Sequence, residues 1–232
     1  MKIELLYFEG CPAREPTRSN IDAELAALGI AATVSEVDVE SDDAARSLGF
    51  PGSPTVRVNG QDIEAQARPQ AAGRRCRLYV SQSGVVESVP DRALIRDALL
   101  GRPRPAQVAV HGSTQPKACC ADSGSGAQRD VRVQLLTASW CPRCPQARRF
   151  WRDVRDRMRE DGRELRLEEV DVESAAGRQL VEEHGIRAVP TTLIDGELVR
   201  IDSDADRAAA RHRVEGKCAD PTSLRQATFH PR

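Results

Sequence analysis

Residues 131–144 read VRVQLLTASWCPRC, in which a β-rich run leads into a cysteine-proline turn. Beyond the turn, apolar residues recur at the spacing of one face of an α-helix. Cys141 is therefore expected at the N-terminus of a helix, with Cys144 one turn later and within disulfide reach. The residues expected on the buried face of this helix are Ala147, Phe150, Trp151, Val154 and Met158.

The same pattern occurs earlier in the chain. The hexapeptide EVDVES is present twice, 133 positions apart, LLYFEGCP around Cys11 aligns with LLTASWCP around Cys141, and GSPTVRVNG around Pro54 aligns with AVPTTLIDG around Pro190. Each copy predicts a β-α-β segment followed by β-β-α, which is typical of a mixed sheet covered by helices. We predict an α/β fold with two domains, each a central mixed β-sheet flanked by α-helices.

The composition between and after the copies predicts the domain boundaries. Residues 101–129 are rich in Pro and Gly and have no hydrophobic periodicity, which indicates a flexible linker. Residues 218–232 are expected to form a loose tail. One domain is thus expected at 1–100, with a single active-site cysteine, and a second at 130–217, with a CxxC motif.

The overall composition excludes several classes of function. The 232 residues carry 34 basic and 35 acidic side chains and only 8 aromatic ones, which argues against a nucleic-acid partner. No apolar run approaches the roughly 18 residues of a membrane helix, and residues 1–8 lack the organisation of a signal peptide. We expect a cytoplasmic protein without a membrane partner, in which seven cysteines favour redox or metal chemistry.

The CxxC motif predicts thiol chemistry. The positive end of the helix dipole favours a thiolate at Cys141, which is expected to be the nucleophile, with a lower pKa and a more exposed sulfur than Cys144. It would attack a substrate disulfide, and Cys144 would resolve the mixed disulfide. The alternative is half of a zinc site, which requires a second Cys or His pair that the sequence does not provide at matching spacing. Three nearby arginines would further favour the thiolate: Arg143, Arg148 and Arg149.

The second unit resembles thioredoxin and its relatives in its WCxxC motif and in the segment HGIRAVPTTLIDGELV at 184–199. The resemblance implies that the Val189–Pro190 bond is cis and faces the CxxC motif, with Pro190 shaping a substrate groove that Trp140 and Thr191 border. A cis-proline leaves neighbouring main-chain groups free to pair with an extended substrate. The sequence departs from thioredoxins at Leu135, where they carry a buried acid, and it lacks the glycine pair of glutaredoxins.

The first unit keeps Cys11 but has Arg14 in the place of a resolving cysteine. Its Ser-Pro-Thr segment preserves the cis-proline signature, so Pro54 is expected in a substrate groove. The unit resembles small bacterial thioredoxin-like proteins with a YFxGCP opening and a later Cys-Arg-x-Tyr, some of which carry mercury-lyase-like labels. Cys11 is interpreted as a thiol nucleophile or a soft-metal ligand. The alternative is that the first unit has lost its activity and has only a structural role. Cys76 is either an inert core residue or a partner that the segment 61–75 brings near Cys11.

The linker contains the adjacent pair Cys119 and Cys120. Adjacent thiols form a disulfide only in a strained ring, so a reduced pair that chelates a soft cation is one interpretation. Cysteines without a role in an unselected linker are the other. No cofactor is predicted, apart from the alternative of a soft metal ion bound by thiolates.

These observations favour a thiol-disulfide oxidoreductase with a Cys141/Cys144 couple and a second, monothiol unit. Its partners would be protein or small-molecule disulfides and a thiol reductant or reductase. The alternative is a protein that binds or transfers mercury or arsenite through Cys11, Cys119, Cys120 and the CxxC motif. A third hypothesis makes the first unit a docking module for substrates of the second.

Overall fold

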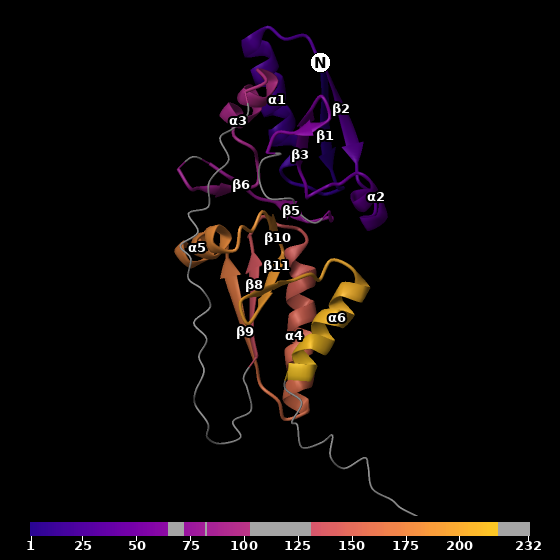
Figure 1. The fold of residues 1–232 in the computed structure, drawn as a ribbon, viewed down its shortest axis with the longest axis vertical. Coiled ribbons are helices and arrows are strands. Elements are labelled where there is room, and N and C mark those ends of the chain that lie inside the picture. The colour runs from indigo at the N-terminus through magenta and orange to yellow at the C-terminus, as the bar shows by residue number, and fades with distance from the viewer. Residues whose placement is uncertain (65–71, 82, 103–130, 218–232) are drawn as a thin grey trace, which may run out of the picture.

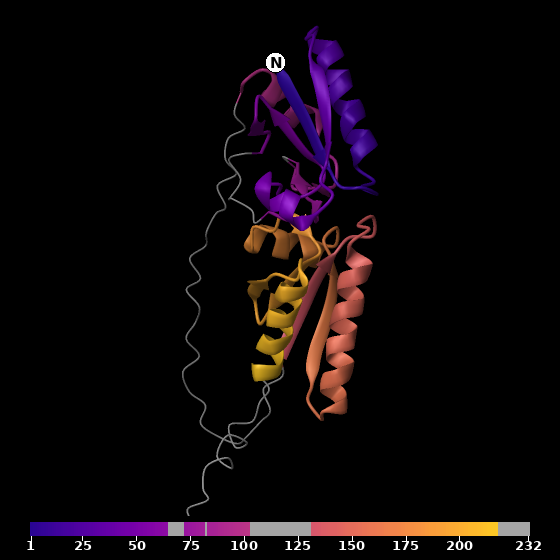
Figure 2. The ribbon, with the colours of Figure 1, turned by 90° about the vertical axis from the view of Figure 1, so that its right-hand side faces the viewer.

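The protein is described by a computed structural model that covers residues 1–64, 72–81, 83–102 and 131–217. These residues form two α/β units that lie end to end along the long axis of the molecule (Figures 1 and 2). The Cys119–Cys120 pair, the linker predicted at 101–129 beyond residue 102, and the tail predicted at 218–232 lie outside the described residues.

The first unit has a four-stranded sheet in the order β2-β1-β3-β4. Strand β1 pairs in parallel with β2 and antiparallel with β3, so the sheet is mixed. The strands are β1 (Lys2–Tyr7), β2 (Thr33–Asp38), β3 (Thr55–Val58) and β4 (Gln61–Asp62), and the helices are α1 (Arg14–Leu28), α2 (Asp42–Ser47) and α3 (Arg92–Leu99).

The second unit repeats this topology, with the sheet order β12-β11-β8-β9. Its first two strands are again parallel and its remaining pairs antiparallel. The predicted α/β class, with mixed sheets flanked by helices, is therefore confirmed. The strands are β8 (Val131–Thr137), β9 (Leu165–Asp171), β10 (Ala188–Val189), β11 (Thr191–Ile194) and β12 (Glu197–Val199), and the helices are α4 (Cys144–Glu160), α5 (Ala175–Glu183) and α6 (Asp204–Lys217).

Local sequence accounts for where the helices lie and begin. The five apolar residues predicted on one face of α4 are all buried. Ser41 and Ser174 cap α2 and α5 with side-chain oxygens that accept backbone N–H groups, and Asp91 does the same for α3. These caps satisfy N–H groups that a helix cannot pair internally.

Three short strands follow the first sheet: β5 (Cys76–Arg77), β6 (Tyr79–Val80) and β7 (Val86–Glu87). Strand β5 leaves its own unit's sheet and pairs antiparallel with β10 of the second unit, and Figure 1 shows it between the two units. One hydrophobic cluster draws buried residues from both sides of this junction, including Phe8, Leu78, Val189 and Leu193. The two units consequently share part of their core.

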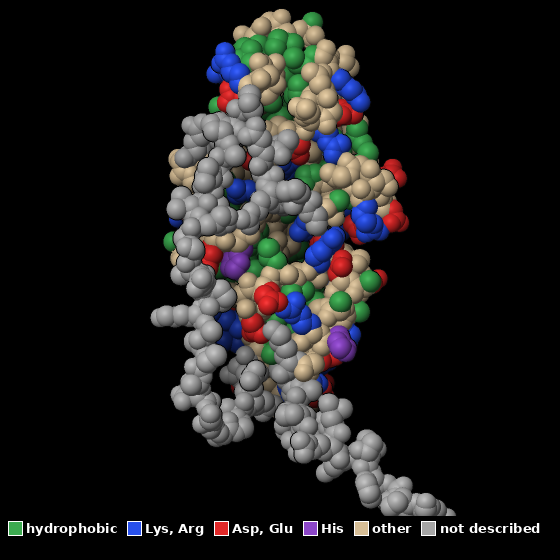
Figure 3. Space-filling view, in the orientation of Figure 1, with side chains coloured by type: hydrophobic (Ala, Val, Ile, Leu, Met, Phe, Trp, Pro, Cys, Tyr) green, Lys and Arg blue, Asp and Glu red, His purple; other side chains and the backbone are tan. Residues whose placement is uncertain are grey.

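The surface carries charges of both signs. On the face shown in Figure 3, acidic and basic side chains are interspersed over both units. At the junction, Arg75 lies 3.7 Å from the Asp202 carboxylate and Arg200 donates to the Ala72 carbonyl, so polar contacts join the units at this rim. Within the described residues, no helix combines the length and the apolar character needed to cross a bilayer.

Candidate active site at the junction of the two units

Cys141 and Cys144 lie where β8 gives way to α4. The backbone N–H of Cys141 donates to the Ala138 carbonyl and that of Cys144 donates to the Cys141 carbonyl, both at 3.3 Å. The helix begins at Cys144 with a proline in its first turn, a position at which proline costs no hydrogen bond. Cys141 thus lies three residues before the first helical residue, close to the predicted placement.

The electrostatics of the two thiols differ sharply. Hydrogen bonds with Cys144 and Cys76 lower the pKa of the Cys141 thiol to about 4 and outweigh its burial. The hydrogen bond with Cys141, together with burial, raises the pKa of Cys144. This is the division expected of a nucleophile and a thiol that stays protonated until the nucleophile has reacted.

The segment before Pro190 lies beside this pair. The Val189–Pro190 peptide bond is cis, and in its thiol form Cys141 donates to the Val189 carbonyl at 3.7 Å. Thr191 turns its hydroxyl back onto the Ala188 carbonyl at 2.6 Å. Pro190 and Thr191 are buried, and Trp140 packs partly buried against the shared core cluster. The fold therefore brings together the residues expected around the groove of the second unit.

Both thiols of this pair are buried. Cys141 is 3% exposed and Cys144 is fully buried, so Cys141 is the more exposed thiol by only a small margin. The reason is the pairing of β5 with β10, which covers the groove with a segment of the first unit. Sequence periodicity gave no indication of this cover.

The first unit has the matching arrangement around Cys11. The Ser53–Pro54 bond is cis, and the Cys11 thiol is hydrogen-bonded to Ser53, although burial dominates and raises the pKa of this thiol. Pro54 is buried, as Pro190 is in the second unit, and its carbonyl accepts the Tyr79 hydroxyl at 2.8 Å.

Cys11 itself is half-buried and lines an open hollow of about 380 Å³. Arg14, which replaces the resolving cysteine, also lines the hollow and donates from Nε to Glu36 at 2.8 Å. Its guanidinium lies 4.1 Å from the centre of the Tyr7 ring. A cation thus stands where a second thiol of a CxxC pair would be.

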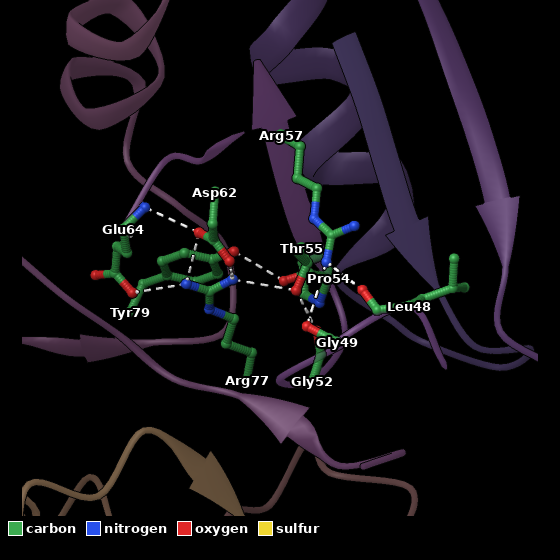
Figure 4. Close-up of polar contacts among 10 residues, drawn as sticks. All are labelled: Leu48, Gly49, Gly52, Pro54, Thr55, Arg57, Asp62, Glu64, Arg77 and Tyr79. Atoms are coloured by element: carbon green, nitrogen blue, oxygen red, sulfur yellow. Dashed lines mark hydrogen bonds and ion pairs between the residues drawn. The ribbon is translucent and has the colours of Figure 1, made fainter. Parts of the chain in front are cut away.

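Cys76 and Arg77 are the site residues that sequence reasoning placed incompletely. Cys76 is buried in the core cluster against which Cys11 packs, so neither sequence-based alternative for it is contradicted, and it is also hydrogen-bonded to Cys141. Arg77 received no role, yet its guanidinium holds Asp62 at 2.7 and 2.9 Å and Glu64 at 3.2 Å (Figure 4). The available signal was the alternation Cys-Arg-Leu-Tyr, which matches a strand with two differently occupied faces.

Four described cysteines, Cys11, Cys76, Cys141 and Cys144, are free thiols. Among the residues that the structure covers, no three His, Cys, Asp or Glu side chains are grouped so as to hold a metal ion. The candidate soft-metal pair in the linker, Cys119 and Cys120, lies outside these residues.

The repeated strand order and the dithiol at the start of α4 define the thioredoxin-like class of thiol-disulfide oxidoreductases. Among curated proteins, a thioredoxin from Methanocaldococcus jannaschii is 34% identical over 68 residues, which span 29% of this chain and 74% of that protein. The chain therefore belongs to the thioredoxin family, and this membership assigns it redox chemistry at the level of the family. No family model matches the chain.

Two solved structures are similar at lower levels. Oxidised thioredoxin from Plasmodium falciparum is 20% identical, covers 40% of this chain and 85% of its own, and gives a TM-score of 0.30. A protein disulfide oxidoreductase from Aeropyrum pernix is 14% identical, covers 94% of this chain and 88% of its own, and gives a TM-score of 0.32. The family assignment does not depend on either of them.

Proposed function

We propose that this chain is a thiol-disulfide oxidoreductase in which Cys141 is the nucleophile and Cys144 the resolving thiol. The observation that carries the proposal is the position of the pair at the start of α4, beside the cis Val189–Pro190 segment, where hydrogen bonds with Cys144 and Cys76 lower the pKa of Cys141. The sulfur of Cys141 lies beside the Val189 carbonyl, next to main-chain groups that pair with an extended strand. A thiolate in this position is ready to react with a sulfur presented by such a strand.

The reaction proceeds by two exchanges. The Cys141 thiolate attacks one sulfur of a substrate disulfide, a Cys141–substrate bond forms, and the other substrate sulfur leaves as a thiolate. Cys144 then loses its proton, attacks Cys141 and releases the second substrate thiol, leaving a Cys141–Cys144 disulfide. An external thiol reductant returns both cysteines to the thiol state, so two electrons pass from reductant to substrate in each cycle.

The timing of the second exchange follows from the electrostatics. The hydrogen bond to the Cys141 thiolate is the largest contribution to the raised pKa of Cys144. That contribution disappears once Cys141 is bonded to substrate, because the mixed disulfide carries no charge. Arg148, whose charge lowers the pKa of Cys144, then favours its ionisation. This arginine supplies assistance at a site where Leu135 replaces the buried acid of thioredoxins.

We propose the domain division set out from the sequence, with thioredoxin-like domains at 1–100 and 130–217. The matching sheet orders of the two units support it. Protein or small-molecule disulfides are the proposed substrates, with a thiol or a reductase as electron donor. Cys11, Pro54, Trp140, Val189, Pro190 and Thr191 are proposed to contribute to the two substrate-facing regions.

Insulin reduction by dithiothreitol tests the Cys141/Cys144 assignment. The wild-type chain should accelerate the reaction, Cys141→Ser should fall to the uncatalysed rate, and Cys144→Ser should accumulate a mixed disulfide with insulin. Cys218→Ser serves as a matched control that should retain the wild-type rate. Equal rates for the wild type and Cys141→Ser would remove the assignment.

A further inference from the structure

Strand β5 lies on the second unit as an extended peptide substrate would. Cys76 is in register with Val189 and Arg77 with Ala188, and the Leu78 N–H donates to the Arg187 carbonyl at 2.7 Å. An added strand of this kind gains affinity from main-chain hydrogen bonds and specificity from alternate side chains. Here the added strand belongs to the same chain.

Alternate side chains of this segment serve different units. Cys76 and Leu78 are buried in the core cluster shared with the second unit, whereas Tyr79 is buried in the core of the first. Arg77 points back into the first unit, where it is held by the carboxylates of Asp62 and Glu64 (Figure 4). The first unit therefore holds the segment through Arg77 and Tyr79, and the alternate residues Cys76 and Leu78 face the second unit.

The opposite edge of β5 contacts the first unit in a similar way. The Ser53 N–H donates to the Arg75 carbonyl and the Arg77 N–H donates to the Ser53 carbonyl, both at 2.8 Å. A Cβ on Gly52 would lie 3.0 Å from the Arg75 oxygen, and its φ of +150° favours glycine, so this close approach depends on the absence of a side chain.

Cys76 consequently lies between the residues that precede the two cis-prolines. Ser53 on one side is hydrogen-bonded to the Cys11 thiol, and Val189 on the other accepts from Cys141. The Cys76 thiol is hydrogen-bonded to Cys141, and Cys11 packs against the same cluster. A cysteine has one side-chain torsion, and a change of its staggered rotamer redirects the sulfur.

We propose that Cys11 and Cys76 form a second dithiol-disulfide couple, which exchanges electrons with the Cys141/Cys144 couple through a Cys76–Cys141 disulfide. The first unit is then the resident substrate of the second. This inference rests on the proposed function of Cys141 and Cys144.

The exchange is balanced within the chain. The Cys141 thiolate attacks the Cys76 sulfur of a Cys11–Cys76 disulfide, the Cys76–Cys141 bond forms and Cys11 leaves as a thiolate that takes up a proton. Cys144 then gives up its proton and attacks Cys141, and Cys76 leaves as a thiol. Two electrons have moved from the Cys141/Cys144 dithiol to the Cys11–Cys76 disulfide, and the reverse sequence moves them back.

The four cysteines of the relay differ in their exposure to solvent. Cys76, Cys141 and Cys144 are each no more than 3% exposed, whereas Cys11 lines the open hollow. A thiol or disulfide from outside therefore meets Cys11 first. Thiol-disulfide exchange requires access to the attacked sulfur. While β5 is docked, the buried couple therefore communicates with that partner through Cys76, and Cys141 reacts with an external disulfide directly once β5 is displaced.

A trapping experiment on the full-length chain tests the central bond. Cys119, Cys120 and Cys218 are replaced by serine in every sample, and Cys144→Ser is added to prevent resolution. The protein is oxidised with one equivalent of oxidised glutathione, quenched in acid, alkylated and mapped by peptide mass spectrometry. The Cys76–Cys141 disulfide should exceed the Cys141–glutathione adduct by roughly tenfold, because a tethered thiol outcompetes millimolar free thiol.

The matched control adds Cys76→Ser to the same background, and there the glutathione adduct at Cys141 should replace the internal bond. A companion sample with Cys141→Ser instead of Cys144→Ser should yield the Cys11–Cys76 disulfide. Far-UV circular dichroism checks the fold, and alanine replaces serine at position 144 if that variant does not fold.

The outcomes separate the two proposals. The relay is overturned if Cys141 is bound to glutathione while Cys76 is recovered as an alkylated free thiol. It is also overturned if the companion sample contains no Cys11–Cys76 disulfide. If the protein with Cys144 intact still forms the Cys141–Cys144 disulfide and reduces insulin, the proposed function stands without the relay. Failure of Cys141 to form any disulfide overturns both.

Discussion

Replacing Arg77 with methionine should destabilise the first unit and release β5 from the second. The Arg77 side chain is 6% exposed, and its partners Glu64 and Asp62 are 10% and 19% exposed. Removing one member of a buried ion pair costs about 3 to 5 kcal/mol, because the remaining charge stays buried without compensation. With an m-value of about 1.5 kcal/mol/M, the urea midpoint should fall by about 2 to 3 M.

Urea titration followed by two probes measures this effect. Both tryptophans of the chain, Trp140 and Trp151, lie in the second unit, so their fluorescence reports on that unit while circular dichroism reports on both. Arg57→Met is the matched control, because Arg57 donates only to the carbonyls of Leu48 and Gly49 near the surface. It should cost about 1 kcal/mol.

The sign of the pH dependence provides an independent check. Burial raises the pKa of Glu64 and Arg77 lowers it, so removing Arg77 raises this pKa further. A carboxyl whose pKa is raised by folding contributes stability below its unfolded pKa and loses that contribution as the pH rises. The difference in the free energy of unfolding between the wild type and Arg77→Met should therefore become smaller as the pH is lowered from 7 to about 4.5. Equal midpoints for Arg77→Met and Arg57→Met at pH 7 would refute the reasoning.

Two further predictions concern single groups. Cys76→Ala removes a hydrogen bond to the Cys141 thiolate, so the pKa of Cys141 should rise above its wild-type value of about 4. The ultraviolet absorbance of the thiolate, measured against Cys141→Ser as a blank, follows this titration. An unchanged midpoint would mean that this hydrogen bond is absent in solution. Gly177→Ala should destabilise the chain by about 1 to 3 kcal/mol in thermal unfolding, because the new Cβ would clash with the Asp171 carbonyl of β9. Gly216→Ala has open space around its Cβ and should instead stabilise α6 by about 0.5 to 1 kcal/mol, so similar effects at both glycines would contradict the packing of α5 on β9.

The sequence was sufficient for features that depend on local patterns. Helical spacing identified the buried face of α4. Ser203 and Asp206, three residues apart at the start of α6, form reciprocal hydrogen bonds, which is a local capping pattern of the same kind. The duplication indicated that both units share one topology, because segments with the same hydrophobic and turn patterns form the same strands and helices. These features require no knowledge of which distant segments meet.

The location of β5 could not be obtained in this way. The strand comprises two residues, Cys76 and Arg77, too few for a period of two to stand out from chance. Its partners Ser53 and Val189 are distant in sequence, and neither carries a side chain that marks a strand edge. Because β5 pairs with β10 beside Cys141, a local pattern could not reveal how little of this thiol is exposed.

Under the proposed function, β5 and an external substrate peptide compete for the same main-chain groups of β10. An external peptide that needs the main-chain groups of Val189 must first displace Cys76, so it binds only the fraction of molecules in which the strand has come away. Each 1.4 kcal/mol that favours the docked strand weakens the apparent affinity of such a peptide tenfold. The strength of the ion pairs that hold Arg77 in the first unit would then determine the apparent affinity of the second unit for an external peptide.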